Sequence, residues 1–348
     1  MSGRGYNALS RLVHRLALKY TAVAEISFDI ENAVLKDAGP VAGNHVFVSG
    51  LARSGTTVLM QYLHQTGRFK ALTYRDMPFV LMPNLWKKLS NRQAAGPTQE
   101  RAHKDGIMID FDSPEAFEEV FWRVFCGKVY ILPDRLQIHR VDSAVSKKFN
   151  AYIKNVLHSA DSRQQTRYLS KNNNNILRLG YLQKNFPDSF VIIPFRHPLQ
   201  QSNSLLQQHN NFVKIQSEDK FALDYMNWLG HFEFGLNQKS FFLGDKTLFE
   251  RMQKHPKTSI NFWLLNWKNY YQYALEQAAG NTTFFNYEEF CNNPAGSLDR
   301  LFKKIDIDSP GLQPSVFNRQ QEPVDGFDKE LLDECLSIYQ SLVAKAGE

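Results

Sequence analysis

The sequence predicts an α/β fold in which helices flank a central parallel sheet. Short runs rich in β-branched and aromatic residues alternate with segments of helical spacing, an order typical of parallel sheets whose connections cover both faces. Of the 348 residues, 43% are hydrophobic, enough to bury the core of one large domain. We therefore expect a single domain over residues 1–348, with its core at 44–300.

The first element is an amphipathic helix within residues 7–36. Arg11, Arg15 and Lys19 lie on its polar side. A basic amphipathic helix can lie on a membrane surface, so peripheral membrane contact is one interpretation. We expect instead that the helix packs its apolar stripe against its own domain. The stripe recurs every three or four positions and comprises Leu9, Leu12, Val13, Leu16, Tyr20, Val23 and Ile26.

Four strands and several helices follow. The strands are expected at 45–49, 167–170, 190–195 and 282–285. A helix that ends at Gly67 follows the first strand, and Pro198 is placed to open the helix after the third. Further helices are expected through 176–182, through 117–124 and at 328–345.

The turn after the first strand has the features of an anion-binding loop. It reads Gly50-Leu51-Ala52-Arg53-Ser54-Gly55-Thr56-Thr57 and opens a helix. Glycines let the backbone approach a ligand, and the helix N-terminus adds a positive dipole end. The spacing is that of a Walker A motif, except that Thr56 stands where the lysine should be. This context predicts a P-loop-like three-layer fold.

The turn resembles that of the PAPS-dependent sulfotransferases (PAPS, 3′-phosphoadenosine-5′-phosphosulfate), whose loop reads strand, [KR]-S-G-T-T, helix. Its arginine form is similar to the tyrosylprotein and bacterial glycan sulfotransferases, whereas the cytosolic small-molecule enzymes have lysine. The resemblance implies PAPS as donor, no metal, and binding of its 5′-phosphosulfate by Arg53, Ser54, Gly55, Thr56 and Thr57. Arg53 is placed to stabilise charge on the departing phosphate. The cytosolic enzymes stack adenine on a tryptophan where this chain has Val58, so the adenine partner stays open.

A second family signature is an arginine at a strand end and a serine eight residues later, both on the 3′-phosphate. Here Arg196 ends the strand 190–195 and Ser204 follows at that spacing. The guanidinium fork suits a phosphate, and the serine lies on the next helix. Two such anion-binding turns in the family's order imply a PAPS site.

Lys171 ends the strand at 167–170. Similar enzymes place a lysine here against the sulfonate or bridging oxygen, often as K-x-P, and this chain has Lys-Asn-Asn. The resemblance implies that Lys171 helps to stabilise the leaving phosphate. The run Asn172–Asn175 could cap the next helix or donate hydrogen bonds to the acceptor.

Transfer to a hydroxyl also requires a general base. Tyrosylprotein-type enzymes use a glutamate on the segment after the first helix, and Asp76 is the carboxylate of that region here. We predict Asp76 as the base, with pairing to Arg75 as the structural alternative. Other candidates are His103, Asp105 and Glu115, although Asp112 or Ser113 is expected to cap the helix through 117–124, with Glu115 favouring its dipole.

The acceptor is expected to be a carbohydrate or glycolipid. Aromatic residues make up 13% of the chain, and sugar rings stack on such side chains. Segments 68–165 and 205–280, rich in loops and aromatics, are expected to form the acceptor walls. The candidate contacts are Trp86, Trp122, Trp228, Trp263, Trp267, Gln207, Gln208, His209, Asn210 and Asn211.

Composition also bears on the partners and the location of the protein. The net charge of +6 is spread along the chain and is accounted for by an anionic small ligand, so no nucleic-acid partner is expected. Three cysteines without a CxxC pair, and no secretory signal, predict a cytoplasmic protein. Two alternative functions stay open: a P-loop kinase, which the missing lysine argues against, and a nucleotide-binding protein without catalysis.

Overall fold

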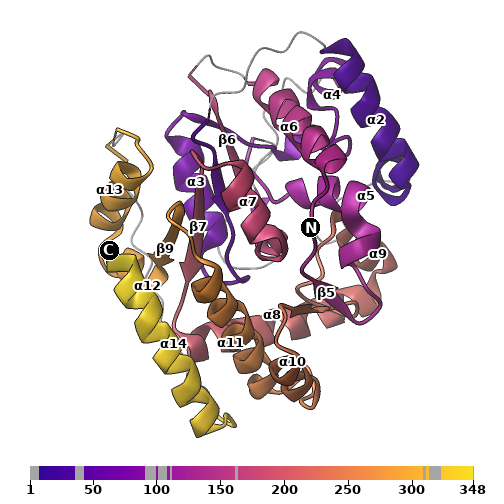
Figure 1. Ribbon diagram of the computed structural model, residues 1–348. Helices are drawn as coiled ribbons and strands as arrows, with labels where there is room; N and C mark the ends of the chain where they lie inside the picture. Colours follow the sequence, from indigo (N-terminus) through magenta and orange to yellow (C-terminus); the bar gives the residue numbers. More distant parts are fainter. Residues whose placement is uncertain are drawn as a thin grey trace.

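A computed structural model describes residues 8–35, 43–90, 112–160, 164–308, 311–312 and 323–347, and the backbone of 99–100 and 108–109. A five-stranded parallel sheet lies at its centre (Figure 1). The strands follow the order β2 (Phe69–Lys70), β6 (Arg167–Lys171), β1 (Val46–Val48), β7 (Phe190–Phe195) and β9 (Thr282–Asn286). The predicted fold class and all four predicted strands are confirmed; β2, with two residues, is too short for a sequence signal.

Alternate strand residues face two separate cores. Phe47 belongs to the larger core, and its neighbours Val46 and Val48 belong to the smaller one. The smaller core is closed by α3 (Thr56–Gln65), α12 (Tyr287–Asn292) and α13 (Pro294–Lys304). The sheet is therefore the middle layer of three. The larger core is closed by helices that include α5 (Glu118–Tyr130), α6 (Ser143–His158), α7 (Leu179–Asn185), α8 (Pro198–Glu218), α11 (Ile260–Gln277) and α14 (Lys329–Gly347).

The remaining elements surround this frame. They are α1 (Ala8–His14), the π-helical turn η2 (Arg15–Lys19), α2 (Thr21–Val34), the 3₁₀ turns η3 (Tyr74–Asp76) and η4 (Asn173–Arg178), α4 (Pro83–Leu89), α9 (Lys220–Leu229), α10 (Lys246–Gln253), and two strand pairs, antiparallel β3 (Gln99–Glu100) with β4 (Met108–Ile109) and parallel β5 (Arg135–Gln137) with β8 (Ser240–Phe242).

The prediction that residues 205–280 are loop-rich is wrong. Helices α8, α9, α10 and α11 occupy most of this segment. The aromatic residues that suggested walls of a site are largely core, because α11 is buried on nearly all sides.

The N-terminal segment departs from its prediction. The helix is interrupted at Tyr20, and much of the expected core stripe is exposed, including Leu9, Leu16 and Ile26. The side that packs on the domain contains Leu18 and Phe28, among others. The error has a physical cause, because these helices have two apolar faces and spacing alone cannot say which one packs. None of the helices within the described ranges has an apolar stretch suited to crossing a membrane.

Candidate active site

The anion-binding loop follows β1 and ends where α3 begins. Ser54 Oγ donates to the carbonyl of Leu51 at 2.7 Å and closes the turn. Gly55 has φ of +87°, and a Cβ there would lie 2.4 Å from the Tyr287 ring. The site therefore requires glycine at this position. Thr56 and Thr57, both buried, form the first turn of α3, so the backbone N–H groups that a helix leaves without intrahelical partners lie at this loop.

Arg53 and Ser204 come together although they are far apart in the sequence. Arg53 Nε donates to Ser204 Oγ at 3.0 Å. Arg53 also has a positive φ of 70°, which is rare for a residue with a Cβ and is common in ligand-binding turns. The geometry joins the two sequence motifs in one site.

Arg196 and the loop both lie against Tyr287. The guanidinium carbon of Arg196 is 5.6 Å from the centre of the Tyr287 ring, and the same ring lies so close to Gly55 that a Cβ there would clash with it. Arg196 Nε lies 3.9 Å from Glu288 Oε1. Burial raises the pKa of Glu288, although the hydrogen bond from the His197 backbone and the charge of Arg196 oppose this shift. The arginine therefore stands at the carboxyl edge of the sheet beside the loop.

Gln201 holds the loop against this strand end. Its Nε2 donates to the carbonyl of Ala52 at 3.0 Å, and its Oε1 accepts from Trp267 Nε1 at 3.0 Å. The same indole nitrogen donates to the Arg196 carbonyl at 3.1 Å. Gln201 is fully buried. The sequence analysis missed it, and its position one turn before Ser204 is the only signal that could have suggested it.

Lys171 lies at the same edge of the sheet. Strand pairing places it beside Val48, the last residue of β1, two positions before the loop. Its Nζ lies 3.4 Å from Glu115 Oε1, and Tyr74 donates to Glu115 Oε2 at 2.8 Å. The Lys171 and Glu115 side chains are 10% and 12% exposed. The expectation that Glu115 favours the dipole of the following helix is wrong, because α5 begins at Glu118 and Glu115 contacts Lys171 instead.

Asp76 lies in a different local environment. Its Oδ2 accepts from the backbone N–H of Thr73 at 2.7 Å and from Thr73 Oγ1 at 3.2 Å, so the carboxylate caps η3. Arg75 pairs with Asp112 through its Nη2 at 2.7 Å. The structural alternative for Asp76, pairing with Arg75, is therefore replaced by the Thr73 cap. Asp112 does not cap α5, whose N-cap residue, Phe117, makes no side-chain cap bond.

The other expected site residues divide into two groups. His103 and Asp105 lie outside the described residues. Trp122, Trp263 and Trp267 are fully buried, so stacking of a sugar on them is excluded, while Trp86 is partly buried. Within the described ranges, no group of three His, Cys, Asp or Glu residues could hold a metal ion.

Residues 45–238 match a model of the sulfotransferase family, and they make up more than half of the chain. The chain belongs to this family. The structure is similar to sulfotransferase STF1 from Mycobacterium tuberculosis H37Rv, with a TM-score of 0.52 and 12% identity over 99% of this chain and 85% of that one. It is also similar to sulfotransferase STF9 from Mycobacterium avium, with a TM-score of 0.51 and 13% identity over 96% and 78%. A comparison with curated proteins gives no match.

These likenesses, at such low identity, show that the chain shares the sulfotransferase fold. The chain is therefore a sulfotransferase enzyme by family, with the loop, Arg196 and Lys171 at one edge of its sheet.

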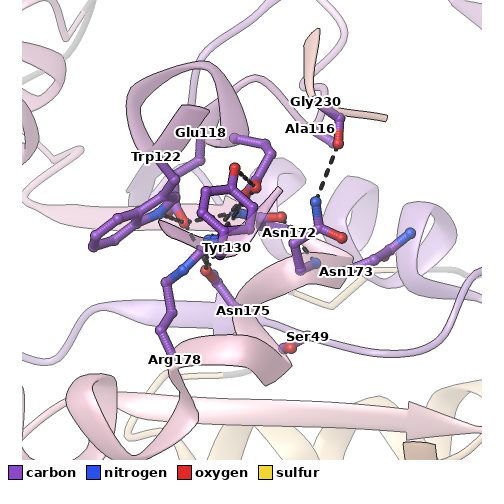
Figure 2. Close-up of polar contacts among 12 residues, drawn as sticks. Ser49, Ala116, Glu118, Trp122, Tyr130, Asn172, Asn173, Asn175, Arg178 and Gly230 are labelled. Carbon is purple, nitrogen blue, oxygen red and sulfur yellow. Dashed lines mark hydrogen bonds and ion pairs between the residues drawn. The ribbon is translucent and has the colours of Figure 1, made fainter. Parts of the chain in front are cut away.

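A buried polar cluster fixes Lys171 and Glu115 in this sulfotransferase. Asn172 donates to Glu118 Oε1 at 3.1 Å (Figure 2). It also donates to Glu119 Oε2 at 2.8 Å. Asn175 donates to Glu118 Oε1 at 2.9 Å, and Arg178 Nη1 donates to Glu119 Oε2 at 2.8 Å. The cluster ties the segment after Lys171 to the segment after Glu115.

The run Asn172–Asn175 therefore has mainly a structural role. Asn172 accepts from the Asn174 backbone N–H at 3.0 Å, which confirms the cap, although the capped element is the 3₁₀ turn η4. The amides of Asn172 and Asn175 face buried carboxylates, so they are not directed to an acceptor. Burial alone would raise the pKa of Glu119, but the charge and hydrogen bonds of Arg178 hold it below its ordinary value.

Replacing Arg178 with methionine should destabilise the fold by about 3–5 kcal/mol, because it leaves the Glu119 carboxylate buried without its cation. Both side chains are at most 1% exposed. Urea unfolding measures the effect. The matched control is Arg300→Met, whose pair with Glu289 is exposed and should contribute less than about 1 kcal/mol. The double variant Arg178→Met/Glu119→Leu should recover stability, and equal midpoints for Arg178→Met and Arg300→Met would contradict this account.

Proposed function

We propose that this sulfotransferase transfers the sulfonate group of PAPS to an acceptor hydroxyl on a carbohydrate or glycolipid. The observation that supports this most is the contact of Arg53 with Ser204, while Arg196 lies over the ring of Tyr287, which also contacts the loop at Gly55. Two anion-binding groups, the loop with Arg53 and the strand end with Arg196, thereby lie at one edge of the sheet. PAPS has two anionic ends, a phosphosulfate and a 3′-phosphate, and so matches this pair.

In this proposal the loop binds the 5′-phosphosulfate. The backbone N–H groups of Ser54, Gly55, Thr56 and Thr57 face the anion, and the N-terminus of α3 adds its dipole. Arg196 binds the 3′-phosphate together with Ser204, whose hydroxyl also accepts from Arg53. Tyr287 contacts both the loop and Arg196, and Gln201 binds the loop carbonyl of Ala52, so the two residues keep the loop and the arginine in place.

The reaction is an in-line transfer. The acceptor oxygen forms a bond to sulfur, the bond from sulfur to the bridging oxygen breaks, and adenosine 3′,5′-bisphosphate (PAP) leaves with the negative charge. Arg53 and Lys171 stabilise that charge, because cations placed where charge develops lower the barrier most. The hydroxyl proton passes to a carboxylate.

Two carboxylates are candidates for this proton. Asp76 is the residue predicted from the family's spacing, and one of its oxygens is engaged in the η3 cap. Glu115 Oε1 lies 3.4 Å from Lys171 Nζ, the cation proposed to face the sulfonate, and the carboxylate also accepts from the Ala116 N–H and from Tyr74. We propose Glu115 as the base, because its distance to Lys171 ties it to the reacting group and the cap gives Asp76 a structural task.

The proposal also includes the class of acceptor, a carbohydrate or glycolipid. The buried tryptophans do not support this class, because a sugar cannot reach them. Trp86 does, because it is partly buried and donates to the carbonyl of Met77, one residue beyond η3. Gln207 and Asn210, exposed on α8, offer amides on the same helix as Ser204.

A labelling experiment tests the function against the kinase alternative. The enzyme is incubated with ³⁵S-labelled PAPS in EDTA, and separately with γ-³²P-ATP and Mg²⁺, together with fractionated glycans and glycolipids. We expect ³⁵S in a fraction, and loss of that label with Arg53→Ala. Incorporation of ³²P alone would contradict the proposal.

Arg196→Ala should weaken PAP binding about 10- to 100-fold, because a charge-assisted phosphate contact is lost. Binding of adenosine 5′-phosphosulfate, which lacks the 3′-phosphate, should change little. Ser204→Ala should act in the same direction with a smaller effect. Calorimetric titration with both nucleotides measures this, and equal losses for the two would show that Arg196 does not bind the 3′-phosphate.

A further inference from the structure

Large apolar side chains lie exposed along the N-terminal helices. On α1 and η2 and at the junction with α2 they are Leu9, Leu12, Leu16 and Tyr20. On α2 they are Val23, Ile26, Ile30 and Val34, and Ile26 is 57% exposed. Their spacing of three or four residues puts them on one face within each helix. We call these eight residues the N-terminal apolar row.

The row is not the face by which α2 packs on the domain. A different side of α2 makes those contacts. Phe28 packs edge-on against Phe125 with ring centroids 5.3 Å apart. Glu31, fully buried, accepts from the backbone N–H groups of Asn84 at 2.8 Å and Leu85 at 3.1 Å on α4. On α2 the row is therefore a second apolar face of an anchored helix, and exposed apolar side chains gathered in this way mark an interaction site.

Basic side chains accompany the row. Arg15 and Lys19 are exposed on η2. Helix α4, which Glu31 holds against α2, has exposed Lys87 and Lys88 in its last turn, and its last residue, Leu89, is 70% exposed. Lys87 Nζ also donates to the Ser159 carbonyl at 3.4 Å.

Acidic groups offset this charge only in part. Asp29 is exposed on α2, while Glu25 is bound by Lys148 at 2.9 Å. Apolar residues beside a surplus of cations complement the surface of a bilayer with anionic lipids.

We propose that the N-terminal apolar row docks this enzyme on membranes that contain anionic lipids. Helix α2 has 14 residues, fewer than the ~20 needed to span, so it lies in the plane of the interface with the row in the lipid. Arg15, Lys19, Lys87 and Lys88 contact the headgroups. The inference concerns binding to lipid and does not depend on the identity of donor or acceptor.

Vesicle flotation with the full chain tests this. Vesicles of phosphatidylcholine alone are compared with vesicles that also contain phosphatidylglycerol. We expect binding to the anionic vesicles, with weaker binding at high salt. Ile26→Ser/Ile30→Ser should reduce it by about tenfold or more, because buried apolar area is lost. Arg15→Gln/Lys19→Gln should reduce it by about fivefold for each charge, on anionic vesicles only.

The control is Val343→Ser, which removes an apolar residue that is 40% exposed from α14, far from α2 in Figure 1. It should bind as the unchanged enzyme does, and all variants should keep its melting temperature. Absence of binding to anionic vesicles, or unchanged binding of Ile26→Ser/Ile30→Ser, would overturn the proposal. A dimer in solution that Ile26→Ser/Ile30→Ser converts to a monomer would also overturn it, by assigning the row to a second copy of the chain.

Discussion

Glu115→Gln should lower kcat by about 10²–10⁴-fold, the range for loss of a general base. Glutamine keeps the shape of the side chain and its contact with Tyr74, so PAP affinity should not fall. Because the variant removes the charge partner of Lys171, which is only 10% exposed, the melting temperature should fall somewhat. Single-turnover kinetics with saturating PAPS measure the chemical step. A residue that only positions Lys171 would instead change PAP affinity together with kcat.

Asp76→Asn is the matched comparison. If Asp76 only caps η3, this variant should lose stability through the Thr73 contacts, and it should retain turnover once folded. If Asp76 is the base, as the family's spacing predicts, the roles are reversed: Asp76→Asn loses 10²–10⁴-fold in kcat and Glu115→Gln stays active. Full activity of both variants would assign the base to His103 or Asp105.

Arg53→Ala should lower kcat by about 10²–10³-fold, the scale for one donor at a transition state. Nucleotide affinity should fall less, because the N–H groups of Ser54, Gly55 and Thr56 remain in the loop. Arg53→Lys should restore part of kcat through its charge, although it cannot reproduce the Nε contact with Ser204. Equal losses in kcat and in PAP affinity for Arg53→Ala would show that Arg53 serves binding and has no special role in the transfer.

Local signals in the sequence predict much of the frame. The strand at 190–195 and Pro198 at the start of α8 are confirmed, as is Gly67 just beyond the end of α3, where φ is 71°. Each of these depends on neighbouring residues only, through β-branched runs, a fixed proline φ or a left-handed glycine. The loop Gly50–Thr57 is predicted for the same reason.

Contacts between distant segments could not be predicted. Glu115 and Lys171 are 56 positions apart, and nothing in the residues around either one names the other. The pair Glu119–Arg178 is similar, because a buried charge in a helix looks like an exposed one until its partner is known. Gln201 is hidden in a polar stretch of α8 for the same reason.

The N-terminal helices show that apolar spacing alone does not predict which face of a helix packs on the domain. Periodicity identifies a stripe of apolar residues, but Phe28 and Ile26 fall on two apolar faces of one helix. Only the contacts with α4 and α5 decide which face packs. The residues that spacing assigned to the core became the surface from which membrane docking is proposed.

Binding of PAP in the presence of EDTA tests the central claim most directly, since the claim is a metal-independent site for a nucleotide with phosphates at both ends. Melting curves are recorded with excess PAP, with adenosine 5′-monophosphate and with ATP. The account predicts that PAP stabilises the enzyme most, by about 2.7 kcal/mol at a concentration 100 times its Kd, and that Arg196→Ala removes most of its advantage over adenosine 5′-monophosphate. A melting curve that PAP leaves unchanged, or stabilisation by ATP only when Mg²⁺ is added, would contradict it.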